Sequence, residues 1–273
     1  MNHKKNVLTV AGSDSSGGAG IQADLKTLEA LNVYGASVIS SITAQNTLGV
    51  QAIFDLPTDI FAAQLESVFS DIHFSAVKIG MLKLVPYIEL TAESLRRYKP
   101  DFVVMDPVMV SSSGKRLMDE SALTVAQETL FPYIHLLTPN IPEAATLLSC
   151  STSWVSNNRK QACEKLMQTL DLQSVLLKGG HADSDICVDT LAFKEAGTLS
   201  FSAFSRSKIN SPNTHGTGCT LSSAIAGYIA LGFPLEQAVK LAGEFTHKSI
   251  LLNDQLQVGQ GCGPLNHRGA QQR

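Results

Sequence analysis

The sequence predicts an α/β fold with a mostly parallel central sheet and helices on both faces. Short apolar runs alternate along the chain with segments whose apolar residues recur every three or four positions, which is the spacing of one helix face. The apolar runs are nearly continuous, as expected for parallel strands that helices cover on both sides. A chain of 273 residues with 44% hydrophobic content is near the size at which one domain still forms a single core. We therefore predict one domain over residues 1–265 and a polar, disordered tail over residues 266–273.

Strand and helix candidates follow one another up to residue 180. The strands, rich in leucine and β-branched residues, are predicted at residues 6–12, 36–43, 76–80, 102–106, 134–138 and 174–180. Apolar stripes at helical spacing predict the intervening helices at residues 21–31, 57–72, 86–98, 120–131 and 141–148. The runs "ICVDTLAF" and "TLSFSAF" then predict a hairpin around residues 195–197. Two helices, over residues 216–231 and 235–252, complete the order.

Composition and charge exclude several classes of function. A net charge of -3, with no cluster of lysines and arginines among aromatic residues, argues against binding to nucleic acid. The first residues lack the apolar core of a signal peptide. The most apolar window, residues 221–235, is too short and too interrupted to cross a bilayer. Five widely spaced cysteines without a C-x-x-C pair indicate a reducing compartment and no structural zinc. We expect a cytoplasmic protein that acts on a small molecule, without a membrane partner.

Polar residues gather at the ends of the predicted parallel strands. The segments are "AGSD", "TAQN", "KIGM", "DPVM", "TPN" and "LKGGH", in chain order. In an open α/β sheet the ligand lies outside the carboxyl ends of the strands, where helix N-termini also point inward. These segments should therefore line one crevice.

Two glycine-rich segments have the composition of anion-binding loops. "GSDSSGGAG", residues 12–20, and "HGTGC", residues 215–219, both run into a predicted helix, where backbone N–H groups can bind phosphate. Neither is a Walker motif, because the lysine and the Ser/Thr that follows it are missing. For either loop alone a helix cap with a flexible turn remains an alternative.

Cys219 opens the second of these helices and is the cysteine with a distinctive neighbourhood. A helix N-terminus lowers the pKa of a thiol, so Cys219 could take a proton near neutral pH. An enzyme that phosphorylates an alcohol needs a cradle for phosphate charge and a base at the attacking oxygen. The alternative is a small residue packed against the floor of the crevice.

Together, several motifs resemble a known family. "AGSDSSGGAGIQADLKT", "TAQNT", "FSDIHFSAVKIGML", "DPVM", "LTPNIPEA", "LLKGGH" and "NTHGTGCTLSSAIA" resemble the hydroxymethylpyrimidine kinase/hydroxymethylpyrimidine phosphate kinase family of thiamine biosynthesis, within the ribokinase superfamily. The resemblance implies a ribokinase-like fold, a homodimer, and use of ATP and Mg²⁺. It also implies phosphorylation of 4-amino-5-hydroxymethyl-2-methylpyrimidine to its monophosphate and then to its diphosphate.

The resemblance also assigns residues to roles. The catalytic group would be Cys219 as the base, with Gly216 and Gly218 forming the anion hole around it. The pyrimidine pocket would comprise Gly12, Asp24, Gln45, Met81 and Val108. The nucleotide would contact Lys178, Asn140 and Thr217, and Glu143 would help to hold Mg²⁺. Asp106, which directly follows a predicted strand, is a further candidate that could hold Mg²⁺ through water.

Several of these assignments have local alternatives. The carboxamide of Gln45 can satisfy a ring nitrogen and an exocyclic amine at once, but a solvated glutamine is its rival. Met81 and Val108 could equally be core residues. Asn140 and Glu143 have the spacing of a helix capping box, a role that is compatible with nucleotide or metal binding.

Two other functions and three departures from the family pattern stay in view. A pyridoxal or pyridoxine kinase of the same cysteine-bearing branch is one alternative, and a non-catalytic ligand-binding protein is the other. Ser15 stands where relatives commonly have proline. Ser112 and Pro212 each stand where a lysine is common. We expect these changes to affect phosphate affinity rather than the type of reaction.

Overall fold

A computed structural model of the chain describes residues 5–109, 120–180, 185–195, 197–253 and 256–270. Its strands form one nine-stranded sheet in the order β3-β2-β1-β4-β5-β6-β7-β8-β9. The strands are β1 (Asn6–Asp14), β2 (Tyr34–Asn46), β3 (Gly49–Asp55), β4 (Ala76–Ile79), β5 (Val103–Met105), β6 (Leu136–Leu137), β7 (Ser174–Leu177), β8 (Ile186–Glu195) and β9 (Thr198–Ser207). All pairs from β2 to β7 are parallel, whereas β3, β8 and β9 join antiparallel at the two edges.

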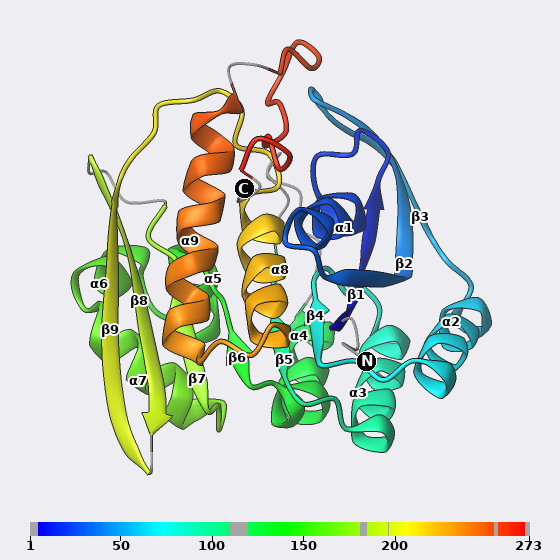
Figure 1. The fold of residues 1–273 in the computed structure, drawn as a ribbon. Coiled ribbons are helices and arrows are strands. Elements are labelled where there is room, and N and C mark those ends of the chain that lie inside the picture. Colours follow the sequence, from blue (N-terminus) through cyan, green and yellow to red (C-terminus); the bar gives the residue numbers. More distant parts are fainter. Residues whose placement is uncertain (1–4, 110–119, 181–184, 196, 254–255, 271–273) are drawn as a thin grey trace.

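Helices cover both faces of this sheet (Figure 1). One face carries α1 (Gly20–Ala30), α8 (Thr217–Ala230) and α9 (Leu235–Leu251). The other face carries α2 (Thr58–Asp71), α3 (Val85–Tyr98), α4 (Glu120–Val125) with a π turn η1 (Ala126–Leu130) and a 3-10 turn η2 (Phe131–Tyr133), α5 (Ile141–Leu147), α6 (Thr152–Asn157) and α7 (Arg159–Thr169). The predicted fold class, a mostly parallel sheet between two helical layers, is confirmed.

Helix α8 lies at the centre of the first face, between α1 and α9 and above β1, β4 and β5. Every residue from Thr220 to Tyr228 is buried, although Ser222 and Ser223 belong to this stretch. The packing of α8 on all sides holds its N-terminus in a defined position at the carboxyl ends of the parallel strands. That position is the basis of the candidate site.

Several predicted elements agree closely with the structure, and others were missed. The hairpin of β8 and β9 is confirmed, and the ends of α8 and α9 agree with the prediction within one residue. The edge strand β3 was not predicted, because its side chains are half-buried or exposed and no continuous apolar run marks it. Helices α6 and α7 were also missed. Their apolar positions are few, and they pack through buried residues such as Val155 and Leu166.

The prediction of a disordered tail is wrong for residues 266–270. Asn266 donates through Nδ2 to the carbonyl of Leu252 at 3.0 Å, and Nε2 of His267 lies 2.9 Å from Oγ1 of Thr220. Ala270 is 1% exposed. The side chains of Asn266 and His267 are buried and bind groups of α8 and of the C-terminal end of α9, whereas Arg268 is exposed. Residues 271–273 lie outside the described part of the chain.

Among the described residues, the helices are all too short or too polar to cross a membrane.

Candidate active site

The candidate site is centred on the N-terminus of α8, where the two glycine-rich segments of the sequence meet. Gly216 is the N-cap residue of α8 and has φ +83°, a left-handed conformation that glycine adopts without strain. A Cβ on Gly216 would lie 1.9 Å from the carbonyl oxygen of Gly18. Only glycine therefore allows the start of α8 to touch the loop that precedes α1.

Cys219 lies in the first turn of α8 and is half-buried. Burial raises the pKa of its thiol to about 11. The ammonium of Lys78 opposes this shift, whereas the carboxylates of Asp24 and Asp106 add to it. The lowered pKa that we predicted from the helix N-terminus is therefore wrong for this structure. The loss of water around the thiol outweighs the positive end of the helix and the nearby lysine.

A buried ion pair lies one helical turn along α8 from Cys219. Ser223 is four residues after Cys219, on the same face of α8, and its Oγ donates to Oδ1 of Asp24 at 2.7 Å. Oδ2 of Asp24 accepts from Nζ of Lys78 at 2.8 Å and from Oγ1 of Thr9 at 2.6 Å. The side chains of Asp24 and Lys78 are both 0% exposed.

Asp24 consequently does not line a pocket for the pyrimidine, and that prediction is wrong. Both of its oxygens are occupied by buried donors, so a ligand could reach them only by breaking the ion pair. Its role in this structure is to hold Lys78 near the catalytic cysteine candidate. The sequence contained no signal for Lys78, because a lysine inside the short strand β4 looks like an ordinary interruption of an apolar run.

A second group of charged side chains lies beside Gly218. Lys178, directly after β7, forms an ion pair with Asp106, and its Nζ lies 3.9 Å from Oε2 of Glu143. A Cβ on Gly218 would lie 3.0 Å from Oδ2 of Asp106 and 3.6 Å from Nζ of Lys178. The structure thus brings the predicted nucleotide and metal residues together at the start of α8, and Gly218 leaves room for their close approach.

Asn140 and Glu143 form the capping box of α5. Oδ1 of Asn140 accepts from the backbone N–H of Glu143, and Oε2 of Glu143 accepts from the N–H of Asn140, both at 2.8 Å. The alternative that we kept for this pair, a helix cap, is confirmed. Burial raises the pKa of Glu143 to about 7. The charge of Asp106 also raises this pKa, whereas the ammonium of Lys178 lowers it. Contact of these residues with nucleotide or metal stays a prediction.

Asp189 and Arg206 support the segment that follows Lys178, and sequence reasoning did not find them. Oδ1 of Asp189 accepts from the backbone N–H of Gly179 at 2.8 Å, and Oδ2 accepts from Arg206 at 3.1 Å. Both residues lie within strands of the antiparallel edge, where nothing local marks them as part of a site. Thr217, predicted for the nucleotide, donates its hydroxyl proton to the carbonyl of Thr214 at 2.6 Å.

The residues predicted for the pyrimidine pocket are only partly brought together. A Cβ on Gly12 would lie 2.8 Å from Cε of Met81 and 3.3 Å from Oγ of Ser41, so Gly12 and Met81 are neighbours. Val108 is half-buried in the segment after β5, and its backbone N–H donates to the carbonyl oxygen of Asp106 at 2.8 Å. Its contact with a substrate ring stays a prediction.

Gln45 lies within β2 rather than in a loop. It pairs with Val50 of β3. The strand predicted over residues 36–43 therefore ended too early, because pairing with the missed strand β3 extends β2 to Asn46. The hydroxyl of Ser15 lies 2.8 Å from both the backbone N and the carbonyl O of Gln45. Ser15, one of the departures from the family pattern, therefore clamps this end of β2. Ser112 lies outside the described residues, and Pro212 is exposed.

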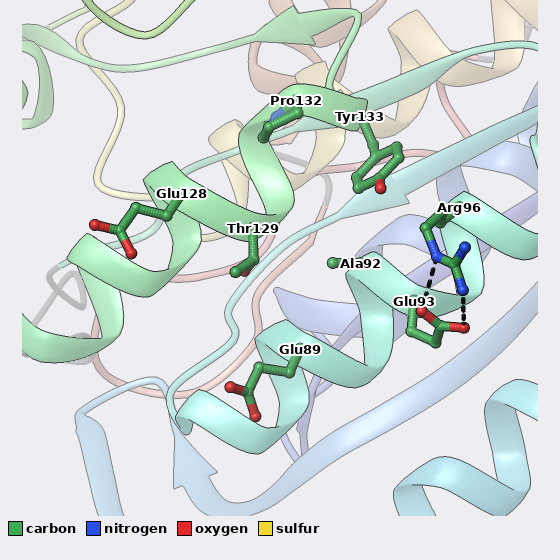
Figure 2. Close-up of a pocket in the computed structure, with 8 residues that line it drawn as sticks. All are labelled: Glu89, Ala92, Glu93, Arg96, Glu128, Thr129, Pro132 and Tyr133. Atoms are coloured by element: carbon green, nitrogen blue, oxygen red, sulfur yellow. Dashed lines mark hydrogen bonds and ion pairs between the residues drawn. The ribbon is translucent and has the colours of Figure 1, made fainter.

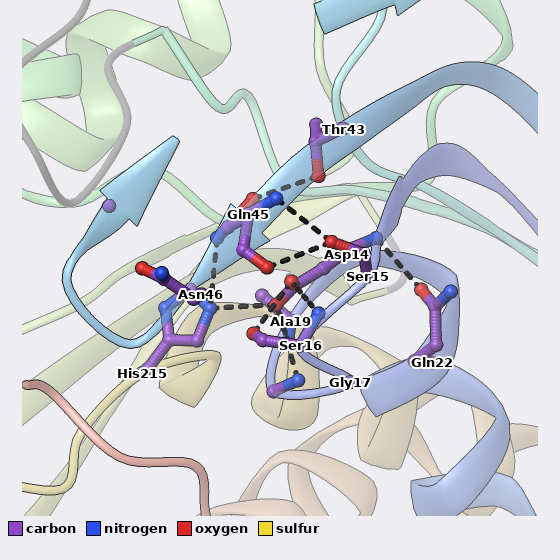
Figure 3. A network of polar contacts seen from close by, with 12 residues as sticks. Asp14, Ser15, Ser16, Gly17, Ala19, Gln22, Thr43, Gln45, Asn46 and His215 are labelled. Atoms are coloured by element: carbon purple, nitrogen blue, oxygen red, sulfur yellow. Dashed lines mark hydrogen bonds and ion pairs between the residues drawn. The ribbon is translucent and has the colours of Figure 1, made fainter. Parts of the chain in front are cut away.

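Figure 3 shows how the first glycine-rich segment closes on Asp14. Oδ1 of Asp14 accepts from the backbone N–H and the hydroxyl of Ser16, and Oδ2 accepts from the N–H groups of Gly18 and Ala19. His215 adds a contact of 2.8 Å from Nε2 to Oδ2. The backbone N–H groups of Ser16, Gly18 and Ala19 are therefore not free to bind a phosphate, because the carboxylate of Asp14 already accepts from them. For these three groups the predicted anion-binding role of residues 12–20 is wrong.

The pocket in Figure 2 is separate from this site. It lies between α3 and the segment from η1 to η2, and its lining residues are Glu89, Ala92, Glu93, Arg96, Glu128, Thr129, Pro132 and Tyr133. Arg96 is held there by Glu93 at 2.7 Å. No predicted site residue belongs to this pocket.

Comparison with known proteins places these residues in a family context. The family model described as phosphomethylpyrimidine kinase matches residues 14–266. The chain is 43% identical over 262 residues to the hydroxymethylpyrimidine/phosphomethylpyrimidine kinase of Escherichia coli, covering 96% of this chain and 97% of that one. It is 47% identical to the thiamine biosynthesis bifunctional protein ThiED of Geobacter sulfurreducens, covering 96% of this chain but spanning about half, 52%, of that relative.

Solved structures show the same similarity. The phosphomethylpyrimidine kinase of Clostridium difficile superposes with a TM-score of 0.77 at 42% identity, covering 90% of this chain and 100% of that one. The pyridoxal kinase of Staphylococcus aureus in complex with ADP superposes with a TM-score of 0.87 at 31% identity, covering 98% and 95%.

Proposed function

The chain belongs to the phosphomethylpyrimidine kinase family, and we propose that it is an ATP-dependent kinase of thiamine biosynthesis. Its first substrate would be 4-amino-5-hydroxymethyl-2-methylpyrimidine, and the monophosphate formed would be its second. The observation that carries this proposal is the start of α8, where both charged groups lie close to Cys219. Gly218, the residue before Cys219, lies beside Asp106 and Lys178, and Ser223, one turn after Cys219, binds Asp24 of the Lys78–Asp24 pair. Cys219 would be the proton acceptor, and Lys178 would offer positive charge for a phosphate chain.

Within this proposal Cys219 takes the proton of the substrate hydroxyl as that oxygen attacks the γ-phosphate. Phosphoryl transfer asks mainly for positioning and for stabilisation of charge, so the N-terminus of α8 would face the transferred group. The carboxamide of Gln45 would bind the ring nitrogen and the amino group of the pyrimidine together. Gly12 and Met81, which are neighbours, would lie against the ring.

The nucleotide would lie along Lys178, Asn140 and Thr217. Support comes from solved relatives, since pyridoxal kinases of this fold have been crystallised with ADP and with AMP-PCP. Lys178 is 14% exposed, so its ammonium can reach a phosphate at the rim of the site. The buried carboxylate of Asp189 would keep the following turn in place for that contact.

Asp106 and Glu143 have the chemistry to hold Mg²⁺. Both carboxylates are buried beside Lys178. Two carboxylates are sufficient for Mg²⁺, which usually takes one or two and completes its shell with water and substrate phosphates. A bound Mg²⁺ would neutralise charge on the β- and γ-phosphates.

The exposed face of the β2–β3 edge supports a homodimer. Ile42 and Phe54, paired across the two strands, are 47% and 62% exposed, and Leu48 at the turn is 69% exposed. Exposed apolar patches of this kind mark interaction sites. Sedimentation should give a dimer for the wild type and a monomer for Phe54→Glu. Five free cysteines fit the reducing cytoplasm that we infer as its location.

Pyridoxal kinase is the second candidate, because pyridoxal kinases superpose over nearly the whole chain. Purified protein with Mg·ATP should be given the pyrimidine alcohol and pyridoxal side by side, and products identified by mass spectrometry. We expect the pyrimidine monophosphate first, then the diphosphate, with a higher kcat/KM than for pyridoxal. Phosphorylation of pyridoxal alone would favour the pyridoxal kinase over the pyrimidine kinase. ADP release without a phosphorylated product would refute both candidate functions.

A further inference from the structure

The orientation of the Gln45 carboxamide is decided by its two polar neighbours. The oxygen and nitrogen of an amide have nearly the same shape, so their positions follow from the hydrogen-bond network. One amide position lies 3.1 Å from Oγ1 of Thr43, and the other lies 3.2 Å from Nε2 of His215. Figure 3 shows both neighbours around Gln45.

Thr43 requires a donor at the nearer amide position. Its hydroxyl has a single proton, and Oγ1 lies 2.9 Å from the carbonyl oxygen of Ser13. A carbonyl can only accept, so the proton of Thr43 is committed to Ser13. The atom of Gln45 that faces Thr43 must then be the NH₂ group, which donates to Oγ1.

His215 requires an acceptor at the other amide position. Asp14 accepts from the N–H groups of Ser16, Gly18 and Ala19. Although burial opposes its charge, the hydrogen bonds from His215 and Ser16 hold the pKa of Asp14 far below its ordinary value. An ionised Asp14 can only accept, so Nε2 of His215 carries a proton and donates at 2.8 Å. The atom of Gln45 on this side must be the carbonyl oxygen, which shares that proton.

We propose that Thr43 and His215 lock the Gln45 carboxamide in one orientation, and that this lock makes the site select a 4-aminopyrimidine over its 4-oxo analogue. The inference rests on the proposed function. After the two internal bonds are made, the half-buried amide retains one N–H donor and one oxygen lone pair. They can pair with a ring nitrogen acceptor and an exocyclic amine donor, in that fixed order.

A 4-oxo pyrimidine with a proton on N3 presents the opposite order, a ring N–H beside a carbonyl. Gln45 could pair with it only by turning its amide by 180°, which would place NH₂ against the N–H of His215 and oxygen against the committed hydroxyl of Thr43. Mispaired buried polar groups are penalised strongly in binding. The selection therefore depends on residues that need not touch the substrate, and Thr43 and His215 are positioning residues.

Isothermal titration with the amino alcohol and with 5-hydroxymethyl-2-methylpyrimidin-4-one tests this lock, together with kcat and KM for phosphorylation of each. We expect the wild type to bind the amino compound at least about 100-fold more tightly, as for two bonds of a bidentate contact. Thr43→Val, which keeps the shape of the side chain, and His215→Leu should each reduce this ratio about tenfold, partly by tightening the binding of the oxo compound. His215→Gln can keep an N–H near the position of Nε2 and should retain most of the ratio.

The double variant with Gln45→Leu separates the lock from a structural effect. In the Gln45→Leu background the ratio should be close to one, and adding Thr43→Val should change it no further, because positioning residues act only through Gln45. A wild-type ratio in Thr43→Val, or an equal change in both backgrounds, would overturn the lock while phosphorylation of the amino alcohol continued. Failure of the wild type to phosphorylate that alcohol would instead overturn the proposed function, and the lock with it.

Discussion

The pH dependence of alcohol phosphorylation is the most direct test of Cys219 as a base. The pKa of its thiol is about 11 in this structure, so only about one molecule in 10⁴ carries the thiolate at pH 7, and each further pH unit raises that fraction tenfold. If the thiolate accepts the proton of the hydroxyl, kcat/KM for the alcohol should rise about 100-fold between pH 7 and pH 9. The sign follows from the raised pKa, since the active base form accumulates only as pH increases.

The second phosphorylation supplies a control on the same protein. Its attacking group is a phosphomonoester with a second pKa of about 6, which is largely ionised at pH 7 and needs little help from a base. Its rate should change little between pH 7 and pH 9. Cys219→Ala should abolish the rise for the alcohol and lower that rate at pH 9 by about 10²- to 10⁴-fold, with a much smaller effect on the phosphate reaction.

Both reactions should be followed in single turnovers at saturating Mg·ATP, so that product release does not hide the chemical step. Equal losses in the two reactions of Cys219→Ala would refute its role as a base and leave it as part of the anion-binding turn. A flat wild-type profile for the alcohol would refute the argument that a thiolate with this raised pKa limits the reaction.

Three further predictions follow from the same geometry. Lys78→Met should lower the free energy of unfolding, measured in urea, by about 3–5 kcal/mol, because it leaves Asp24 buried without its partner. The double variant Lys78→Met/Asp24→Leu should recover part of the lost stability. A double variant no more stable than the single one would contradict the argument. Gln45→Leu should raise KM for the pyrimidine alcohol about 10- to 100-fold with KM for ATP unchanged, and an unaltered pyrimidine KM would mean that Gln45 does not face the ring. Burial and Lys26 lower the pKa of His267 to about 4. The folded protein therefore takes up this proton at lower pH than the unfolded chain, and stability should be lost as pH falls from 6.5 towards 4, by up to about 3 kcal/mol. Thermal melts of His267→Gln should lack this loss, and an equal loss in the variant would assign it to other groups.

The fold was predictable where neighbouring residues carry the signal. Helices α8 and α9 have long apolar stripes with glycine or proline at their starts, and their bounds agree with the prediction within one residue. Strand β3 lacks such a signal, because it is an exposed edge. Since β3 was not predicted, the predicted second strand also ended at residue 43, three residues before the end of β2. Residues 266–270 are polar, and only their contacts with α8 and α9 show why they are ordered.

The site was predictable to the extent that it is local. Asn140 and Glu143 are three residues apart and form their capping box within one helical turn. His215 and Asp14 are 201 residues apart, and neither stands in a pattern that suggests the other. The same holds for Lys78 and Asp24, 54 residues apart, whose pairing removed Asp24 from the predicted pyrimidine pocket.

The sequence by itself determined the alternation of strands and helices, the position of Cys219 at a helix start, and the motifs that indicate the family. These depend on spacing within a few residues, because helix periodicity, capping and turn formation are local interactions. Only the tertiary structure decided the direction of the Cys219 pKa shift, the occupation of the first glycine-rich loop by Asp14, and the orientation of the Gln45 amide. Each of these depends on desolvation and on donors and acceptors from distant segments, and such energies are defined only when all the neighbours of a group are in place.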